Sequence, residues 1–231
     1  MTGFLVANDL RSGYGRIEVL RGVSLAAPAG RVVAVLGPNG VGKTTLMRVL
    51  AGSLPAWSGS IELDGQRIDG RSAYEVARAG VMLIPEGRGV FPGLTVAENI
   101  EIAANGRSRP ERLDELFAMF PQLNDRLAQK AGTLSGGEQQ MLALSRAFLG
   151  DPHVLLVDEI SMGLAPNAVE MLFGALAHLK ERGCTIVLVE QYLGYALRLA
   201  DIVYVIAKGR VTFVGEPSEI TEEGVLVGDS T

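Results

Sequence analysis

The sequence predicts an α/β fold with a mostly parallel central sheet, an N-terminal antiparallel β subdomain and an inserted α-helical subdomain. Five short, uninterrupted apolar runs lead to this prediction, because parallel strands are covered on both faces and show no polar alternation. Longer segments with helical spacing separate the runs, as crossover helices do. The runs cover residues 32–36, 81–84, 154–157, 186–189 and 202–206.

The N-terminal part of the chain has a different pattern. Residues 4–10, 17–25 and 60–63 are more polar and are separated by turn residues. Short, turn-bounded segments of this kind are typical of antiparallel strands. We therefore expect a small antiparallel sheet beside the parallel core.

The middle of the chain is predicted to be helical. Residues 95–131 show an almost entirely helical pattern, which opens with a capping box formed by Thr95 and Glu98. Pro110 and Pro121 mark boundaries inside it, because proline ends or kinks a helix. The chain is thus expected to be one domain over residues 1–231, with its core at about 1–94 and 150–231 and its helical subdomain at about 95–149.

Composition and charge exclude several classes of protein. With 48% hydrophobic and 20% charged residues, the chain has the composition of a folded globular protein. The 21 Lys and Arg residues are outnumbered by 26 Asp and Glu residues, for a net charge of −5. This balance gives no electrostatic basis for nucleic-acid binding or a polybasic membrane anchor.

The sequence also bears on the compartment of the protein. The single cysteine, Cys184, forms no disulfide within the chain, and the first residues lack a basic segment followed by an apolar one. We therefore expect a cytoplasmic chain with no signal peptide. The apolar runs are far shorter than the ~20 residues that a transmembrane helix needs. The mean hydropathy is nevertheless +0.25, which either a buried parallel sheet or an apolar face reserved for another subunit explains.

A glycine-rich loop at residues 37–45 fits the pattern G-x-x-x-x-G-K-[ST] between a buried strand and a helix. In such a loop the backbone N–H groups surround phosphate oxygens, and the N-terminus of the helix adds positive potential. We expect Lys43 to bridge the β- and γ-phosphates and Thr44 to ligate Mg²⁺. The predicted nucleotide contacts of this P-loop NTPase core are Gly37, Pro38, Asn39, Gly40, Val41, Gly42, Lys43, Thr44 and Thr45.

The apolar run at 154–157 ends in two carboxylates, as a Walker B strand does. Asp158 is expected to hold Mg²⁺ through water, and Glu159 to polarise the attacking water as general base. A strand that merely ends in acidic turn residues is the alternative. The glycine-rich loop earlier in the chain favours the interpretation that Asp158 and Glu159 belong to a nucleotide site.

Residues 134–140, Leu-Ser-Gly-Gly-Glu-Gln-Gln, combine a capping box at Ser135 and Glu138 with two small glycines at a helix N-terminus. This run resembles the signature motif of the ATP-binding subunits of ABC transporters. Tyr14 is placed as the family's adenine-stacking aromatic residue, and residues 161–166 resemble its D-loop. The resemblance implies a head-to-tail dimer, in which the signature residues of one subunit face the ATP of the other. These residues are Ser135, Gly136, Gly137 and Glu138.

Two positions depart from the usual family pattern. Glu86 stands where the Q-loop has glutamine, and Gln191 stands where the switch has histidine. A carboxylate oxygen of Glu86 can still contact Mg²⁺ or its water, and the Gln191 amide can still donate a hydrogen bond towards the γ-phosphate. Unlike histidine, Gln191 cannot take up a proton near neutral pH.

Four short motifs resemble one branch of the family, the smaller ATPase subunit of branched-chain (hydrophobic) amino acid importers. They read Pro-Glu-Gly-Arg, Leu-Ser-Gly-Gly-Glu-Gln-Gln-Met-Leu-Ala, Gly-Leu-Ala-Pro and Val-Glu-Gln. The branch implies ATP hydrolysis that powers import, at the cytoplasmic face of the inner membrane. It also implies a second ATPase subunit, two permeases and, indirectly, an extracytoplasmic binding protein. Ile160 and Tyr192 depart from the branch, where proline and asparagine are usual.

Two other functions stay open. One is a soluble ABC-type ATPase acting on ribosomes or DNA, although the chain has no second cassette, long coiled-coil insertion or basic patch. The other is a nucleotide-dependent interaction module with little turnover, which Glu86 and Gln191 make conceivable.

Two surface segments have alternative interpretations. The apolar run of Val90, Phe91, Pro92 and Leu94 either forms a permease-facing patch or packs under the helical subdomain. Residues 107–112 contain three arginines, and Glu111 and Asp114 interleave with them, which predicts a solvated surface.

Overall fold

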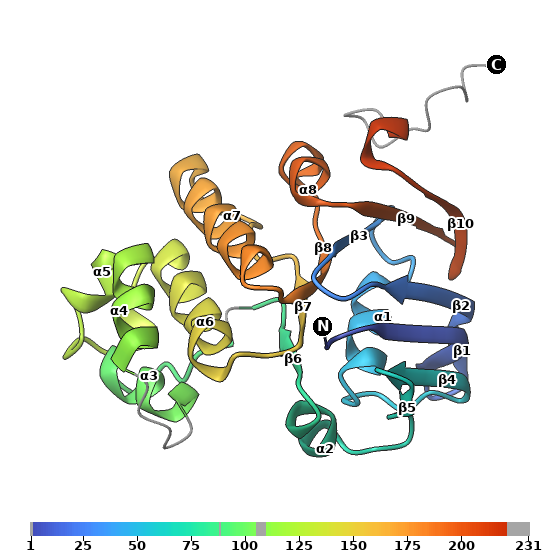
Figure 1. Cartoon of the computed structure of the whole chain (residues 1–231), viewed down its shortest axis with the longest axis horizontal. Helices are drawn as coiled ribbons and strands as arrows, with labels where there is room; N and C mark the ends of the chain where they lie inside the picture. The colour runs from blue at the N-terminus through green and yellow to red at the C-terminus, as the bar shows by residue number, and fades with distance from the viewer. Residues whose placement is uncertain (1, 88, 105–109, 221–231) are drawn as a thin grey trace.

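The larger sheet contains all five predicted apolar runs (Figure 1). The computed structural model describes residues 2–87, 89–104 and 110–220. The strands are β3 (Val32–Leu36), β6 (Val81–Ile84), β7 (Val154–Asp158), β8 (Thr185–Val189), β9 (Ile202–Ala207) and β10 (Arg210–Gly215). Their order is β10-β9-β3-β8-β7-β6, and only the β9–β10 pair is antiparallel. The predicted fold class is confirmed.

The smaller sheet is antiparallel throughout, as expected. It consists of β1 (Leu5–Tyr14), β2 (Ile17–Ala27), β4 (Ser58–Leu63) and β5 (Gln66–Arg67), in the order β2-β1-β4-β5. Asp9 adopts a φ of 47°, and the pairing of β1 shifts register around it. This bulge keeps Leu10 on the buried face, which strict alternation after Ala7 would not do.

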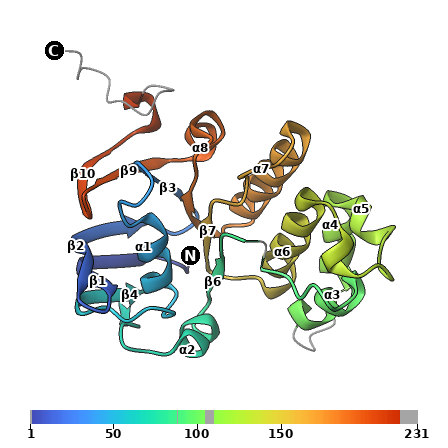
Figure 2. The same cartoon turned by 180° about the vertical axis from the view of Figure 1, so that it is seen from behind.

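Helices cover both faces of the larger sheet. On one side α1 (Lys43–Leu50) adds Leu46, Met47 and Leu50 to an apolar cluster shared with both sheets. On the other side, α7 (Pro166–Glu181) packs in a second cluster with strands β7 and β8. The shorter helix α2 (Ala73–Arg78) lies beside the edge strand β6, whereas α8 (Leu193–Leu199) packs on β3 and β9 (Figures 1 and 2).

The remaining helices gather at one end of the molecule (Figure 2). They are α3 (Val96–Ala104), α4 (Pro110–Met119), α5 (Pro121–Asn124) and α6 (Gly136–Gly150), with a 3₁₀ turn at Ala131–Thr133. A second 3₁₀ turn, Pro217–Glu219, lies away from them, near α8. Glu98 accepts hydrogen bonds from the backbone N–H and hydroxyl of Thr95, which confirms the predicted capping box. The buried rings of Phe120 and Phe148 meet edge to face, with centroids 5.9 Å apart, and pack this end together.

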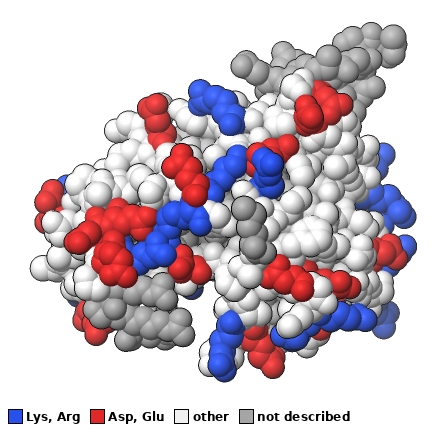
Figure 3. Space-filling view, in the orientation of Figure 1, with Lys and Arg blue, Asp and Glu red and all other residues white. Residues whose placement is uncertain are grey.

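Two further observations concern the surface. On the face shown in Figure 3, acidic and basic side chains alternate, with no large area of one sign. Within the described ranges, no helix has both the length and the apolar character to cross a membrane.

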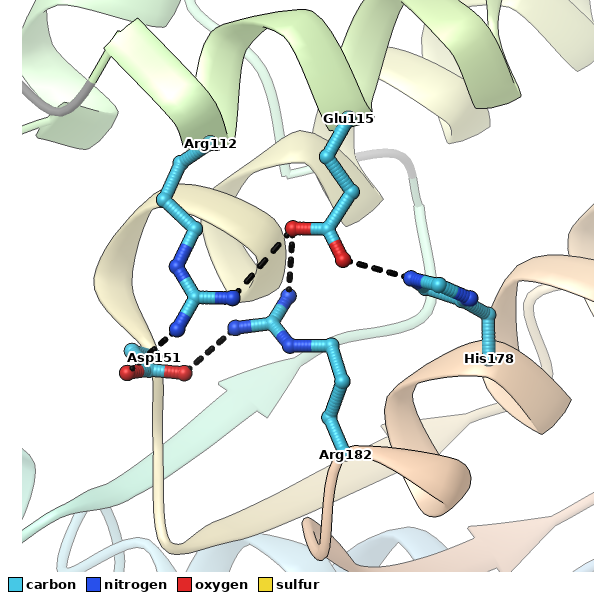
Figure 4. Close-up of polar contacts among 5 residues, drawn as sticks. All are labelled: Arg112, Glu115, Asp151, His178 and Arg182. Atoms are coloured by element: carbon cyan, nitrogen blue, oxygen red, sulfur yellow. Dashed lines mark hydrogen bonds and ion pairs between the residues drawn. The ribbon is translucent and has the colours of Figure 1, made fainter.

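A polar clasp joins α4 to the sheet side of the molecule (Figure 4). We use this name for Arg112, Glu115, Asp151, His178 and Arg182. The Glu115 carboxylate on α4 lies 2.5 Å from His178 Nε2 and 3.1 Å from Arg182 Nη1. Asp151, which follows α6, accepts hydrogen bonds from Arg112 and Arg182 at 2.9 and 2.5 Å. The clasp thus ties three segments that are far apart in sequence.

The clasp corrects one expectation. Arg112 was predicted to lie on a solvated surface, but its side chain is only 23% exposed and is paired with two carboxylates. The prediction failed because its partner Asp151 is distant in sequence. Residues 107–109 lie outside the described part of the chain.

We predict that Glu115→Gln lowers the free energy of unfolding by about 1–2 kcal/mol near neutral pH. Burial alone would raise the pKa of Glu115, but the hydrogen bond from His178, the charge of Arg182 and the hydrogen bond from Arg112 bring it below its ordinary value. This contribution is therefore complete above that ordinary pKa and is lost as the pH falls through the folded-state pKa. Urea denaturation at several pH values measures it.

Glu111→Gln is the matched control, because Glu111 is an exposed carboxylate on the same helix. A stability difference between Glu115→Gln and the parent that stays constant down to about pH 3 would contradict the clasp as described.

Candidate active site

The parallel pairing of β3, β8, β7 and β6 brings four loops to the same edge of the sheet. The glycine-rich loop follows β3, Glu190 and Gln191 follow β8, and Glu159 follows β7. Glu86 comes shortly after β6. A cleft of about 430 Å³ opens there, lined by Tyr14, Val19, Asn39, Gly40, Gly42, Lys43, Thr44, Thr45, Glu86, Glu159, Met162 and Gln191.

The backbone of the glycine-rich loop has conformations that suit only glycine at two positions. Gly37 has a φ of 143°, and a Cβ there would lie 2.2 Å from the carbonyl oxygen of Ile206. Gly42 caps α1 with a φ of 112°, and its carbonyl accepts the first helical hydrogen bond, from Leu46 N at 2.8 Å. The loop is therefore held by backbone fit and leaves its amides around the head of α1, a cradle suited to phosphate.

Lys43 is buried at the base of this loop, with 5% of its surface exposed. Its ammonium donates hydrogen bonds to the carbonyl oxygens of Gly37 and Pro38, at 2.8 and 3.0 Å. It also lies 3.9 Å from Glu159 Oε1. The structure thus holds a cation between the loop and the predicted general base, where a phosphate would meet both.

Thr44 and Asp158, the predicted oxygen ligands of Mg²⁺, are in contact with each other. The Thr44 hydroxyl donates to Asp158 Oδ1 at 3.3 Å. Burial raises the pKa of Asp158 to about 6, the Thr44 hydrogen bond lowers it, and the charges of Glu159 and Glu86 add to the rise. Hard oxygen ligands with excess negative charge suit Mg²⁺, which would relieve this repulsion.

Glu159 and Gln191 are brought together from two strands. Gln191 Nε2 donates to Glu159 Oε2 at 2.8 Å. Glu159 has a φ of 49°, which a non-glycine residue keeps only when its surroundings hold it, and its amide donates to Val189 O at 2.9 Å. The predicted base and the predicted switch residue are therefore in direct contact.

Tyr14 and Glu86 line the same cleft and are both exposed. Tyr14 is 44% exposed and its hydroxyl accepts a hydrogen bond from Arg48 Nη1 at 3.3 Å, so its ring is available for stacking. The site predictions did not include Val19 and Met162, which also line the cleft. Val19 belongs to no motif, whereas Met162 lies within the predicted D-loop.

The signature residues are not part of this cleft. Ser135 caps α6, accepting from Glu138 N at 3.3 Å, while Glu138 Oε2 accepts from Ser135 N at 2.8 Å. Arg126 pairs with Glu138 Oε1 at 3.1 Å. The capping box is thus present, but one chain does not bring these residues to its own glycine-rich loop.

Comparisons with known proteins agree with this geometry. The family profile described as "ABC transporter" matches residues 20–162. The chain is similar to "High-affinity branched-chain amino acid transport ATP-binding protein BraG" of Pseudomonas aeruginosa, with 42% identity over 201 residues covering 86% of each chain. It is 36% identical to "Probable branched-chain amino acid transport ATP-binding protein LivF" of Archaeoglobus fulgidus over 217 residues, 92% of each chain.

A more distant relative has a different role in its name. The "Nod factor export ATP-binding protein I" of Ralstonia nicotianae is 34% identical over 227 residues, which cover 95% of this chain and 69% of that protein. Among solved structures, "Structure of ATP binding subunit of ABC transporter" has a TM-score of 0.82 at 31% identity, covering 92% of this chain and 90% of the other. The predicted fold is confirmed by this likeness.

We predict that Asp158→Asn stabilises the protein in a chelating buffer without nucleotide. The folded-state pKa of Asp158, about 6, exceeds the ordinary value of 3.8. The carboxylate therefore destabilises the fold increasingly as the pH rises from the lower value to the higher one. The gain should be about 1–2 kcal/mol at about pH 8 and close to zero near pH 4. Thermal denaturation across this pH range measures it.

The exposed Asp114 offers the matched control, Asp114→Asn, which should change stability little at any pH. If Asp158→Asn were destabilising at about pH 8, the Asp158 carboxylate would have a compensating partner that the described geometry lacks.

Proposed function

Since the chain belongs to the family of ABC transporter ATP-binding subunits and is an ATPase by that membership, we propose that it powers the import of branched-chain or related hydrophobic amino acids. The observation that carries the site assignment is the contact of Glu159 with both Gln191, at 2.8 Å, and Lys43, at 3.9 Å. The two branched-chain transport relatives support the substrate class.

ATP fits the cleft through groups of this chain. The loop amides and Lys43 hold the phosphates, with Lys43 exchanging the Gly37 and Pro38 carbonyls for phosphate oxygens. Tyr14 stacks on the adenine. Thr44 and Asp158 would hold Mg²⁺, with Glu86 beside them, and the ion when bound neutralises charge on the phosphates.

Glu159 acts as general base towards the water that attacks the γ-phosphate. Its carboxylate lies 3.9 Å from the Lys43 ammonium, so the base and the cation that would hold the γ-phosphate stand side by side. Gln191 holds the carboxylate in place through one of its amide hydrogens and has a second for the γ-phosphate. Since Gln191 does not titrate, the proton taken from water stays with Glu159 or passes to product phosphate.

The site is completed by a second ATPase subunit, either a copy of this chain or a different one. Ser135 is exposed at the N-terminus of α6 and lies outside the cleft of its own chain. In a head-to-tail dimer, Ser135, Gly136, Gly137 and Glu138 of one subunit would face the phosphates bound to the other. We propose that two permeases, served by an extracytoplasmic binding protein, hold this dimer at the cytoplasmic face of the inner membrane.

Phe91 is the residue that we propose meets a permease. It is 52% exposed, whereas Val90 next to it is partly buried and packs against the core. A cavity of about 150 Å³ between this segment and α3 is lined by both residues and by Ile102, itself 50% exposed. Of the two alternatives for this apolar run, core packing therefore describes Val90 and a docking patch describes Phe91. Arg88, the last residue of the Pro-Glu-Gly-Arg motif, lies outside the described residues.

Export is the second candidate direction. It is favoured by the similarity to the Nod factor export protein, which covers 95% of this chain at 34% identity. Import is better supported, because the identity to the branched-chain amino acid protein is 42%.

We predict that Glu159→Gln lowers the ATP hydrolysis rate by ~100-fold or more and leaves ATP affinity within about threefold. The amide keeps the shape of the side chain but cannot accept the proton. Lys43→Ala should instead weaken ATP binding, by about tenfold or more. Calorimetry and a phosphate-release assay separate the two effects.

Glu170→Gln on the exposed face of α7 is the control for a lost carboxylate. Near-parental turnover in Glu159→Gln would remove Glu159 from its role, and unchanged affinity in Lys43→Ala would remove the glycine-rich loop from nucleotide binding. Absence of hydrolysis by the parent, alone and with its partner ATPase, would favour the interaction module.

We predict that the tagged chain, purified from detergent-solubilised membranes, brings down two permeases and a second ATPase. Phe91→Ser should lower permease recovery by about tenfold without changing ATP affinity, because it removes an exposed apolar contact. Mass spectrometry of the eluate measures this. Recovery of ribosomal proteins in place of permeases would instead indicate the soluble ATPase.

A further inference from the structure

Glu190 is a buried carboxylate that none of the roles described so far uses. It follows β8 directly, and only 3% of its surface is exposed. Its Oε1 accepts a hydrogen bond from Ser161 N at 3.1 Å, and its Oε2 accepts from the Ser161 hydroxyl and from Gln191 N, the latter at 3.2 Å. Three neutral donors thus converge on one carboxylate.

Burial of the Glu190 carboxylate costs free energy that an apolar side chain of the same size would not cost. A carboxylate removed from water without a neighbouring cation loses hydration that neutral donors replace incompletely. Burial accordingly raises the pKa of Glu190, although the hydrogen bonds from Ser161 and Gln191 lower it. The carboxylate in turn fixes local geometry, because its two oxygens bind three donors from two different segments.

Those two segments carry the reacting groups. Ser161 is fully buried and lies two residues after Glu159, at the start of the D-loop, and Gln191 is the switch residue. The same segments meet again where Gln191 Nε2 donates to Glu159 Oε2 and where Glu159 N donates to Val189 O. Glu190 therefore adds further contacts between the segment of Glu159 and Ser161 and the segment of Gln191, on the side away from the cleft.

We propose that Glu190 is a positioning residue for ATP hydrolysis, which acts by fastening the Gln191 switch to the D-loop segment so that the Glu159 carboxylate faces the attacking water. The inference rests on the roles proposed for Glu159 and Gln191. Glu190 itself does not line the cleft. It also connects the catalytic pair to a D-loop, the segment expected to touch the second subunit.

Replacement of Glu190 by glutamine isolates this role, because it keeps the shape of the side chain. The amide offers one acceptor and one NH₂ group where two acceptors now stand. Whichever way the amide is oriented, its NH₂ faces the backbone N–H of either Ser161 or Gln191, so at least one hydrogen bond is lost. A small displacement of Glu159 or Gln191 follows, and catalysis is more sensitive to such a displacement than binding is.

The experiment compares ATP turnover and ATP binding by the full chain. The protein concentration is high enough that the turnover per chain no longer rises with it. We expect Glu190→Gln to lower kcat by about 10- to 100-fold with KM for ATP within about threefold. Ser161→Ala keeps its backbone N–H and loses only the hydroxyl contact, so its effect should be smaller, about two- to tenfold in kcat. This milder variant keeps the test valid if Glu190→Gln does not fold.

A double-mutant cycle with Gln191→Ala separates positioning from general destabilisation. If Glu190 acts through Gln191, adding Glu190→Gln to Gln191→Ala should lower kcat by less than about threefold further. The proposal would be overturned if the two changes lowered kcat independently, so that the double variant showed the product of the two single effects. It would also be overturned if Glu190→Gln raised KM and left kcat unchanged, or if Glu190→Gln and Ser161→Ala both kept the parental kcat. Glu170→Gln, an exposed change on α7, is the control and should keep parental kcat.

The outcome also separates this inference from the function on which it rests. If Gln191→Ala and Glu159→Gln hydrolyse ATP at the parental rate, the proposed catalytic pair is wrong. If both are impaired and Glu190→Gln is not, only the role of Glu190 is wrong.

Discussion

The parallel register of β3, β8 and β7 is the constraint on which the site depends. Val35 pairs with Val189, and Val189 pairs with Asp158, so the three strands end at one level. The loops that continue from this level carry Lys43, Gln191 and Glu159. A slip of one residue would move a loop by about 3.3 Å and turn its first side chain to the other face of the sheet. The contact between Glu159 and Gln191 would then be lost.

The same edge of the sheet concentrates buried charge. Lys43, Asp158, Glu159 and Glu190 are all at most 9% exposed. Apart from the single ammonium of Lys43, these groups are carboxylates, so the site is electrostatically unfavourable until cationic or polar ligands enter it. A chain with a net charge of −5 can nevertheless bind a polyanion here, because the loop amides, the α1 N-terminus and Lys43 supply local positive potential beside these carboxylates.

Sequence reasoning predicts best those features that are local. The five apolar runs, the glycine-rich loop and the capping boxes at Thr95 and Ser135 each depend on residues a few positions apart, and each lies where it was expected. The contacts that could not be predicted from the sequence join residues far apart in the chain. Ser161 and Glu190 are 29 residues apart, and Glu115 and His178 are 63 apart. No periodicity links such pairs, because only the packing of the strands and helices brings them together. The roles of the signature residues stay predictions, since they concern a second subunit.

The loops that follow β3, β8, β7 and β6 are proposed to form one ATP site. A crystal structure of the Glu159→Gln variant with ATP and Mg²⁺ tests this most directly. It should show the triphosphate in the cleft of the glycine-rich loop, with Lys43 and the Gln191 amide at hydrogen-bond distance from the γ-phosphate and Mg²⁺ beside Thr44 and Asp158. ATP bound elsewhere, such as in the cavity of about 490 Å³ between β5 and α2, or a γ-phosphate out of reach of residues 159 and 191, would contradict it.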